Sequence, residues 1–137
     1  MPSEPIQVVT TTAEHGDAEK IAKAILEKRL AACVQVSGPI DSRYWWNGRI
    51  ERASEWIVTM KTRPEAYAAL EQAVLGVHPY DQPEVVATPI VGISPGYLKW
   101  LGEQVRIEAA HVDPTSTKAA PKSEVSKSSG SKRSRGT

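Results

Sequence analysis

The sequence has a single cysteine, Cys33, and no apolar run long enough to cross a bilayer. One thiol allows no disulfide within the chain, which is typical of a protein from a reducing compartment. A membrane-spanning helix needs about 20 mostly apolar residues, and the first residues lack the basic and apolar segments of a secretory signal peptide. The sequence therefore predicts a cytoplasmic protein with no membrane partner.

Motifs of the common enzyme classes are also missing. The sequence contains no glycine-rich phosphate loop, no metalloprotease motif and no nucleophile elbow. One arrangement that would support catalysis is a convergence of Lys61, Tyr80 and Glu84 in a cleft, where burial would perturb the pKa values of the lysine and the carboxylate. A structural pairing of Lys61 with a carboxylate is the favoured alternative, and we expect no enzymatic activity.

The charge is small overall but unevenly distributed. From Asp113 onward there are six basic and two acidic residues, a net charge of +4, whereas the preceding part has 11 basic and 14 acidic residues, a net charge of −3. The C-terminal segment is rich in Ser, Lys and Gly and cannot bury enough apolar surface to offset the entropy of ordering. We predict that residues 111–137 are disordered, and their few basic residues without aromatic neighbours disfavour nucleic-acid binding.

The pattern of the remaining residues predicts one domain over residues 6–110, preceded by a flexible N-terminus at residues 1–5. Residues 6–12 are rich in Val and Thr and predict a strand, and apolar residues recur at helical spacing from Asp17. A second strand starts at Cys33, bends at Gly38-Pro39 and continues to Trp46. Asn47-Gly48 is a two-residue hairpin signal, so the third strand is the antiparallel neighbour of the second.

The second half of the domain repeats this strand and helix order. Thr62 and Glu65 have the spacing of a capping box, so we expect a helix to begin there and to end near Gly76. A fourth strand over residues 85–93 contains Pro89, which favours a sheet edge, and a last helix follows Ser94-Pro95. This order predicts an α+β ferredoxin-like sandwich, with an antiparallel sheet, central first and third strands and both main helices on one face.

The other face of this sheet lacks cover, which predicts self-association. Tyr44, Trp45 and Trp46 lie on long strands and carry more apolar surface than so small a domain needs for its own core. Burial against copies of the same chain stabilises such a surface. We assign these three residues to the hairpin and the contact between subunits.

The segment His78-Pro-Tyr-Asp-Gln-Pro-Glu84, called here the His-Pro-Tyr loop (residues 78–84), is the main candidate for a binding site. It combines an imidazole, a phenol and carboxylates with two prolines that restrict the backbone. The alternative interpretation is a rigid connection to the next strand. Cys33 lies among small apolar residues, where packing is favoured over ligation, and His15 and His111 are expected to be exposed.

Five segments of residues 6–108 together resemble the CutA divalent-cation-tolerance proteins. They are Leu30-Ala-Ala-Cys33, Ser42-Arg-Tyr-Trp-Trp-Asn-Gly48, Lys61-Thr62, the His-Pro-Tyr loop and Tyr97-Leu-Lys-Trp-Leu101. The resemblance implies a ferredoxin-like fold similar to that of the PII signalling proteins and a homotrimer in which hairpin strands pair between subunits. It also implies a response to divalent metal ions, with copper binding in some members.

The ligands implied by the resemblance are only partly present. Copper-binding relatives are proposed to use a cysteine on the first strand and two adjacent histidines, and this sequence has Thr10 and Val77 at two of those positions. His78 remains as a ligand, with Glu84 as the second candidate. Since soft thiolate or several imidazoles give copper sites their affinity, we expect weak binding. The alternative is a PII-like module that binds a small anion in a cleft between subunits, near Lys61 and Tyr80, with Arg43 and Arg63 adding positive charge.

Overall fold

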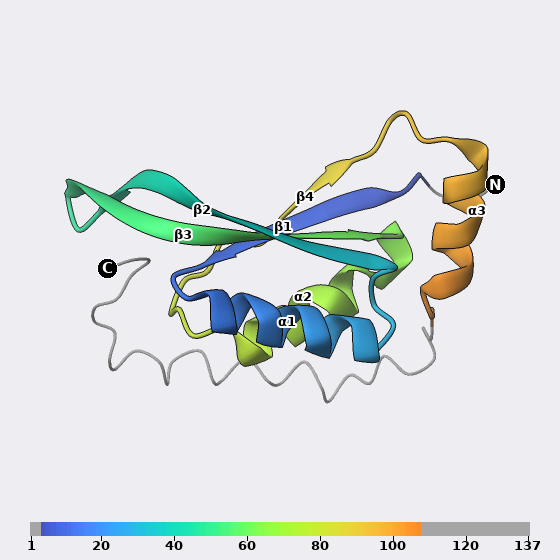
Figure 1. Cartoon of the computed structure of the whole chain (residues 1–137), viewed down its shortest axis with the longest axis horizontal. Coiled ribbons are helices and arrows are strands. Elements are labelled where there is room, and N and C mark those ends of the chain that lie inside the picture. The colour runs from blue at the N-terminus through green and yellow to red at the C-terminus, as the bar shows by residue number, and fades with distance from the viewer. Residues whose placement is uncertain (1–3, 108–137) are drawn as a thin grey trace.

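A computed structural model describes residues 4–107 as a four-stranded antiparallel sheet with two helices on one face and a third helix at one end (Figure 1). The elements, in chain order, are β1 (Ile6–Thr12), α1 (His15–Glu27), β2 (Cys33–Trp46), β3 (Arg49–Thr62), a 3-10 turn (Pro64–Ala66), α2 (Tyr67–Val77), β4 (Val86–Pro89) and α3 (Pro95–Gln104). The strand order is β2-β3-β1-β4. The ferredoxin-like sandwich is therefore confirmed. The predicted disorder of residues 111–137 and the predicted exposure of His111 lie outside the described residues.

The main core lies between the sheet and helices α1 and α2. Val8 faces Met60 across β1 and β3, and both side chains are fully buried on the helix side of the sheet. The buried side chains of this core are Val8, Ala18, Ile21, Ile25, Ala31, Val58, Met60, Leu70 and Val74. The alternation along β1 and β3 that predicted these strands thus decides which residues meet the helices.

The opposite face of the sheet has no helix over it among residues 4–107 (Figure 1). Val86 on this face is 48% exposed. The hairpin of β2 and β3 also extends past the ends of α1 and α2, and near its tip Trp45 is 71% and Ile50 62% exposed. None of the helices in this part of the chain is long and apolar enough to cross a bilayer.

The hairpin turn has the geometry that its sequence predicts. Asn47 and Gly48 have φ values of +51° and +79°, and Trp46 pairs with Arg49 across the turn. Positive φ at both central residues is typical of a two-residue type I′ turn, which Asn-Gly adopts at little cost.

The predicted bulge interrupts β2 at Gly38 and Pro39. Ser37 pairs with Ile57, but the next paired residue, Ile40, faces Glu55. Gly38 has a φ of +145°, and a Cβ built on it would lie 3.0 Å from the carbonyl oxygen of Glu55 and 3.0 Å from the Trp56 ring. Glycine is required here by both the backbone angle and the lack of space.

Two local predictions were wrong. The Thr62 hydroxyl donates a 2.6 Å hydrogen bond to the Leu30 carbonyl instead of capping a helix, and α2 begins at Tyr67, after a 3-10 turn. Strand β4 has only four residues rather than nine. The Ile90 N–H bonds the Pro5 carbonyl in the same register, but Pro5 has no N–H to return a bond, so the ladder ends there. Both differences arise from contacts between segments far apart in the sequence.

The bulge generates a stability prediction. Gly38→Ala is expected to lower the free energy of unfolding by about 1–3 kcal/mol, the usual cost of backbone strain at such a φ, before any clash with Trp56 is added. Gly76→Ala in α2 is the matched control, because a Cβ added at Gly76 would have no atom within 4 Å and a helical alanine should raise stability by about 0.4–1 kcal/mol. Urea unfolding at one fixed protein concentration measures both changes, and an unchanged Gly38→Ala midpoint would contradict the bulge geometry.

Candidate functional site

The His-Pro-Tyr loop is held against the end of β1 by hydrogen bonds to His78. The imidazole Nε2 donates to the Thr11 carbonyl at 2.9 Å, and the Tyr80 N–H donates to Nδ1 at 3.1 Å. The rings of His78 and Tyr80 also pack together, with their centroids 4.8 Å apart. Since one ring nitrogen donates and the other accepts, the arrangement selects the neutral imidazole with its proton on Nε2.

The same loop reaches a buried carboxylate on β3. The Tyr80 hydroxyl donates to Glu55 Oε2 at 2.7 Å, and Glu55 is only 2% exposed. Strand β1 ends at Thr12, opposite Trp56, so no β1 residue pairs with Glu55 and Tyr80 reaches it there. Sequence reasoning missed Glu55 because it closes the polar run Glu51-Arg-Ala-Ser-Glu55, which is typical of a solvated hairpin.

Thr11, rather than Thr10, is the β1 residue beside this loop. Thr10 lies on the helix side with Val8, whereas the Thr11 side chain lies on the other face and is 4% exposed. Neither hydroxyl has a hydrogen-bond partner within residues 4–107. The structure puts Thr10, the first-strand position implied by the resemblance, on the helix side of the sheet, and a shift of one residue changes the face.

Glu84 lies two residues before β4 begins. Val9 pairs with Val86 on β4, and Val85 packs against the helix-side core. If this register continued for two more residues, Glu84 would lie opposite Thr11, because partners in an antiparallel ladder move in opposite directions along their strands. The ladder ends at Val9 and Val86, so the structure brings His78 to Thr11 at the loop corner, and the joining of Glu84 to them stays a prediction.

Lys61 does not join this corner within one chain. Its Nζ donates to Gln35 Oε1 at 2.9 Å, so its partner is an amide and not the expected carboxylate. Lys61 lies six residues beyond Glu55 along β3, roughly 20 Å at the strand rise of about 3.3 Å per residue. The convergence of Lys61, Tyr80 and Glu84 is not formed by a single subunit, and between subunits it stays a prediction.

Cys33 lies at the opposite end of the sheet from His78. It is half-buried and pairs with Lys61 across β2 and β3. Burial and, secondly, the neighbouring Cys33 thiol raise the pKa of Tyr97 on α3. The thiol therefore packs beside a phenol and is separated from the imidazole by the length of β1.

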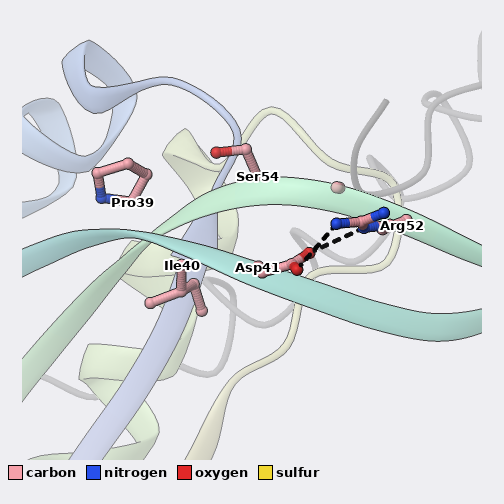
Figure 2. Close-up of a pocket in the computed structure, with 6 residues that line it drawn as sticks. Pro39, Ile40, Asp41, Arg52 and Ser54 are labelled. Atoms are coloured by element: carbon pink, nitrogen blue, oxygen red, sulfur yellow. Dashed lines mark hydrogen bonds and ion pairs between the residues drawn. The ribbon is translucent and has the colours of Figure 1, made fainter.

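A hollow of about 520 Å³ lies on the hairpin near the bulge (Figure 2). The Arg52 guanidinium donates two hydrogen bonds of 3.2 Å to the Asp41 carboxylate, and Arg43 donates another of 3.2 Å. The hydrogen bond from Arg52 is the main cause that lowers the pKa of Asp41. Arg43 is thus paired on the hairpin, and Arg63, which directly follows the 14-residue strand β3, pairs with Glu65 at 3.6 Å. The cations suggested for an anion site do not gather in one chain.

The comparisons with known proteins agree with this fold. A sequence profile described as "CutA1 divalent ion tolerance protein" matches residues 6–104. The chain belongs to this family. The divalent-cation tolerance protein CutA of Archaeoglobus fulgidus is 44% identical over 89 residues, which are 65% of this chain and 86% of that protein. The corresponding Thermus thermophilus protein is 39% identical over 100 residues, 73% of this chain and 96% of that one.

Solved CutA structures match the fold as well. CutA1 from Oryza sativa has a TM-score of 0.75 at 36% identity, with 78% of this chain and 98% of that chain covered. The Thermus thermophilus structure has a TM-score of 0.73 at 37% identity, with 74% and 99% covered. The resemblance stated from the five sequence segments is therefore confirmed.

The donors of this CutA family member do not form a complete metal site in one chain. Among residues 4–107, no three His, Cys, Asp or Glu side chains lie close enough together to hold a metal ion. His15, which was not expected to be a ligand, packs edge-to-face on Trp56 with centroids 4.5 Å apart and lies 3.7 Å from Glu19. A metal bound at the loop corner needs further donors from water or another subunit.

Thr10 and Thr12 are both buried on β1, but only the Thr12 hydroxyl has a hydrogen-bond partner among the described residues. Thr10→Val should raise the free energy of unfolding by about 1 kcal/mol, because it removes a buried hydroxyl that has no protein partner. Thr12→Val is the matched control: its hydroxyl donates to the Glu14 carbonyl at 2.8 Å, so the change should lower stability by about 0.5–1.5 kcal/mol. Equal losses in thermal unfolding of both variants would show that Thr10 is hydrogen-bonded after all.

Proposed function

We propose that this CutA-family protein takes part in the response to divalent metal ions, chiefly copper, by weak binding at the His-Pro-Tyr loop and without catalysis. The observation that supports this most directly is the hydrogen bond that holds His78 against the Thr11 carbonyl at the end of β1. Glu84, two residues before β4, is the second proposed ligand. Imidazole is a common ligand of copper and zinc, and a carboxylate oxygen can complete the coordination.

The hydrogen bonds of His78 explain why this binding should be weak. Both ring nitrogens are engaged, Nε2 with the Thr11 carbonyl and Nδ1 with the Tyr80 N–H. A metal ion must displace one of these hydrogen bonds before it reaches a lone pair. The first-strand cysteine of copper-binding relatives is also replaced, so no soft thiolate is present at this corner.

A homotrimer is part of the proposal. Strand β2 is a 14-residue edge strand, the sheet face opposite α1 and α2 has no helix over it among the described residues, and Trp45 is 71% exposed. Long uncovered edges and aromatic surface favour pairing with other chains. Neighbouring copies would then supply the metal donors that one chain lacks.

We also propose a cytoplasmic location, supported by the single cysteine. The solved structure from Archaeoglobus fulgidus is of a protein described as periplasmic, so the location of this chain needs its own test. Fractionation of cells into cytoplasm and envelope should place it in the cytoplasmic fraction, and recovery outside that fraction would contradict the assignment.

The metal proposal predicts specific changes in copper affinity. Calorimetric titration of the reduced protein should show weak copper binding that His78→Ala abolishes. Thr11→Cys should raise the affinity about tenfold or more, equivalent to at least about 1.4 kcal/mol, because a thiolate then lies beside the imidazole.

The control for this experiment is Thr10→Cys. It adds the same thiol one residue away, on the helix side of the sheet, and should leave the affinity at the loop unchanged. Unchanged affinity in His78→Ala would place the site elsewhere. A calorimetric titration with ATP tests the anion-binding alternative. Heat of binding with ATP but none with copper would favour that alternative.

The trimer predicts a particle of three times the chain mass of 14.9 kDa. Trp46→Ala should shift the mass measured by light scattering toward the monomer, because it removes aromatic surface at the hairpin. Leu26→Ala on α1 is the control, since Leu26 is exposed on the helix layer, away from the open face. A monomeric wild-type protein, or an intact trimer in Trp46→Ala, would contradict this role of the hairpin.

A further inference from the structure

We propose that Glu55 is a positioning residue for the loop corner, which acts through Tyr80 to hold His78 in a state that competes with metal binding. This inference rests on the proposed metal-binding function of His78. Glu55 would then set the metal affinity of the site through the hydrogen bonds that Tyr80 and His78 make.

Glu55 is buried and held in place on the sheet. Its side chain is 2% exposed, and its backbone pairs with Ile40 immediately after the bulge in β2. The carbonyl oxygen of Glu55 lies against Gly38, where even a Cβ would approach to 3.0 Å. A side chain on so closely packed a backbone has little freedom, and a buried carboxylate is costly unless it accepts hydrogen bonds.

Tyr80 connects Glu55 to His78 by two hydrogen bonds. Its hydroxyl donates to Glu55 at 2.7 Å, and its backbone N–H donates to Nδ1 of His78 at 3.1 Å. Pro79 lies between the two residues and restricts the backbone there. The position of the Tyr80 ring, set by Glu55, therefore determines whether the Tyr80 N–H points at the imidazole.

The consequence for His78 is a single tautomer. With Nδ1 accepting from Tyr80, the proton must lie on Nε2, where it is donated to the Thr11 carbonyl. A metal ion at Nδ1 must displace the Tyr80 N–H. A metal ion at Nε2 requires the ring proton to move to Nδ1. That proton would then face the Tyr80 N–H, and the two donors would repel each other. Either route breaks the arrangement that Glu55 supports.

The test measures the tautomer of His78 in the metal-free full-length chain by NMR of ¹⁵N-labelled histidine. The chain has three histidines, and His78→Ala assigns the signal. The wild-type protein should show one tautomer, protonated at Nε2. Tyr80→Phe and Glu55→Leu should both shift the two ring-nitrogen signals toward averaged values, and Glu55→Gln, which keeps an acceptor for the Tyr80 hydroxyl, should restore the wild-type pattern.

Two controls separate positioning from a merely structural role. Glu51→Leu changes a half-buried carboxylate on the same strand and should leave the His78 signals unchanged. Thermal unfolding of each variant is measured as well, because replacing a buried carboxylate by leucine need not lower stability, whereas the tautomer should still change. If Glu55→Leu fails to fold, Tyr80→Phe carries the test, since it removes only the hydroxyl.

Copper titration of the same variants separates this inference from the proposed function. Tyr80→Phe should bind copper roughly fivefold more tightly than wild type, the equivalent of the about 1 kcal/mol that a net hydrogen bond contributes. A single unchanged tautomer in both Tyr80→Phe and Glu55→Leu overturns the positioning role whatever copper does. A changed tautomer with no copper binding in any variant supports the positioning role and overturns the metal function.

Discussion

The attachment of the His-Pro-Tyr loop to the end of β1 and to Glu55 on β3 is the constraint on which the loop corner depends. Strand β4 pairs with β1 only as far as Val9, so Thr11 has no β4 partner, and β1 pairs with β3 only as far as Trp56, so Glu55 has no β1 partner. The Thr11 carbonyl and the Glu55 carboxylate therefore need hydrogen-bond donors from elsewhere. His78 and Tyr80 supply them. Buried polar groups without partners are costly, and satisfying them fixes the imidazole against the end of β1. The polar corner is thus a consequence of unequal strand lengths in a small sheet.

Most of the fold could be predicted from sequence because its signals are local. The alternation in β1, the Asn47-Gly48 turn and the bulge at Gly38-Pro39 each depend on a few adjacent residues, and the structure has all three as expected. The predictions that were wrong depended on distant partners. The spacing of Thr62 and Glu65 indicated a helix cap, but the Thr62 hydroxyl donates to the Leu30 carbonyl, 32 residues away in the sequence. The end of β4 likewise depends on which β1 residue lies opposite Ile90, and that residue is Pro5, which has no N–H to donate.

The candidate site could be predicted only in part, for the same reason. The proline-bounded loop identified His78 and Tyr80, because rigid loops with polar side chains are common binding sites, and its Glu84 stays a prediction. The first-strand position at Thr10 lies on the helix side of the sheet, whereas the neighbouring Thr11 lies on the other face, since strand side chains alternate. Glu55 lies in a polar segment of a hairpin whose burial depends on a loop 25 residues away. Nothing in its neighbours along the chain indicates that a tyrosine will cover it.

The central claim is that metal is bound at the corner where His78 meets β1, in competition with the hydrogen bonds that hold the imidazole. A crystal structure of the full-length protein soaked with copper, with the metal located by its anomalous signal, tests this most directly. The account predicts a peak within bonding distance of a His78 ring nitrogen, with the hydrogen bond to Thr11 or to Tyr80 broken. A copper peak at any other place, with both hydrogen bonds of His78 intact, would contradict it.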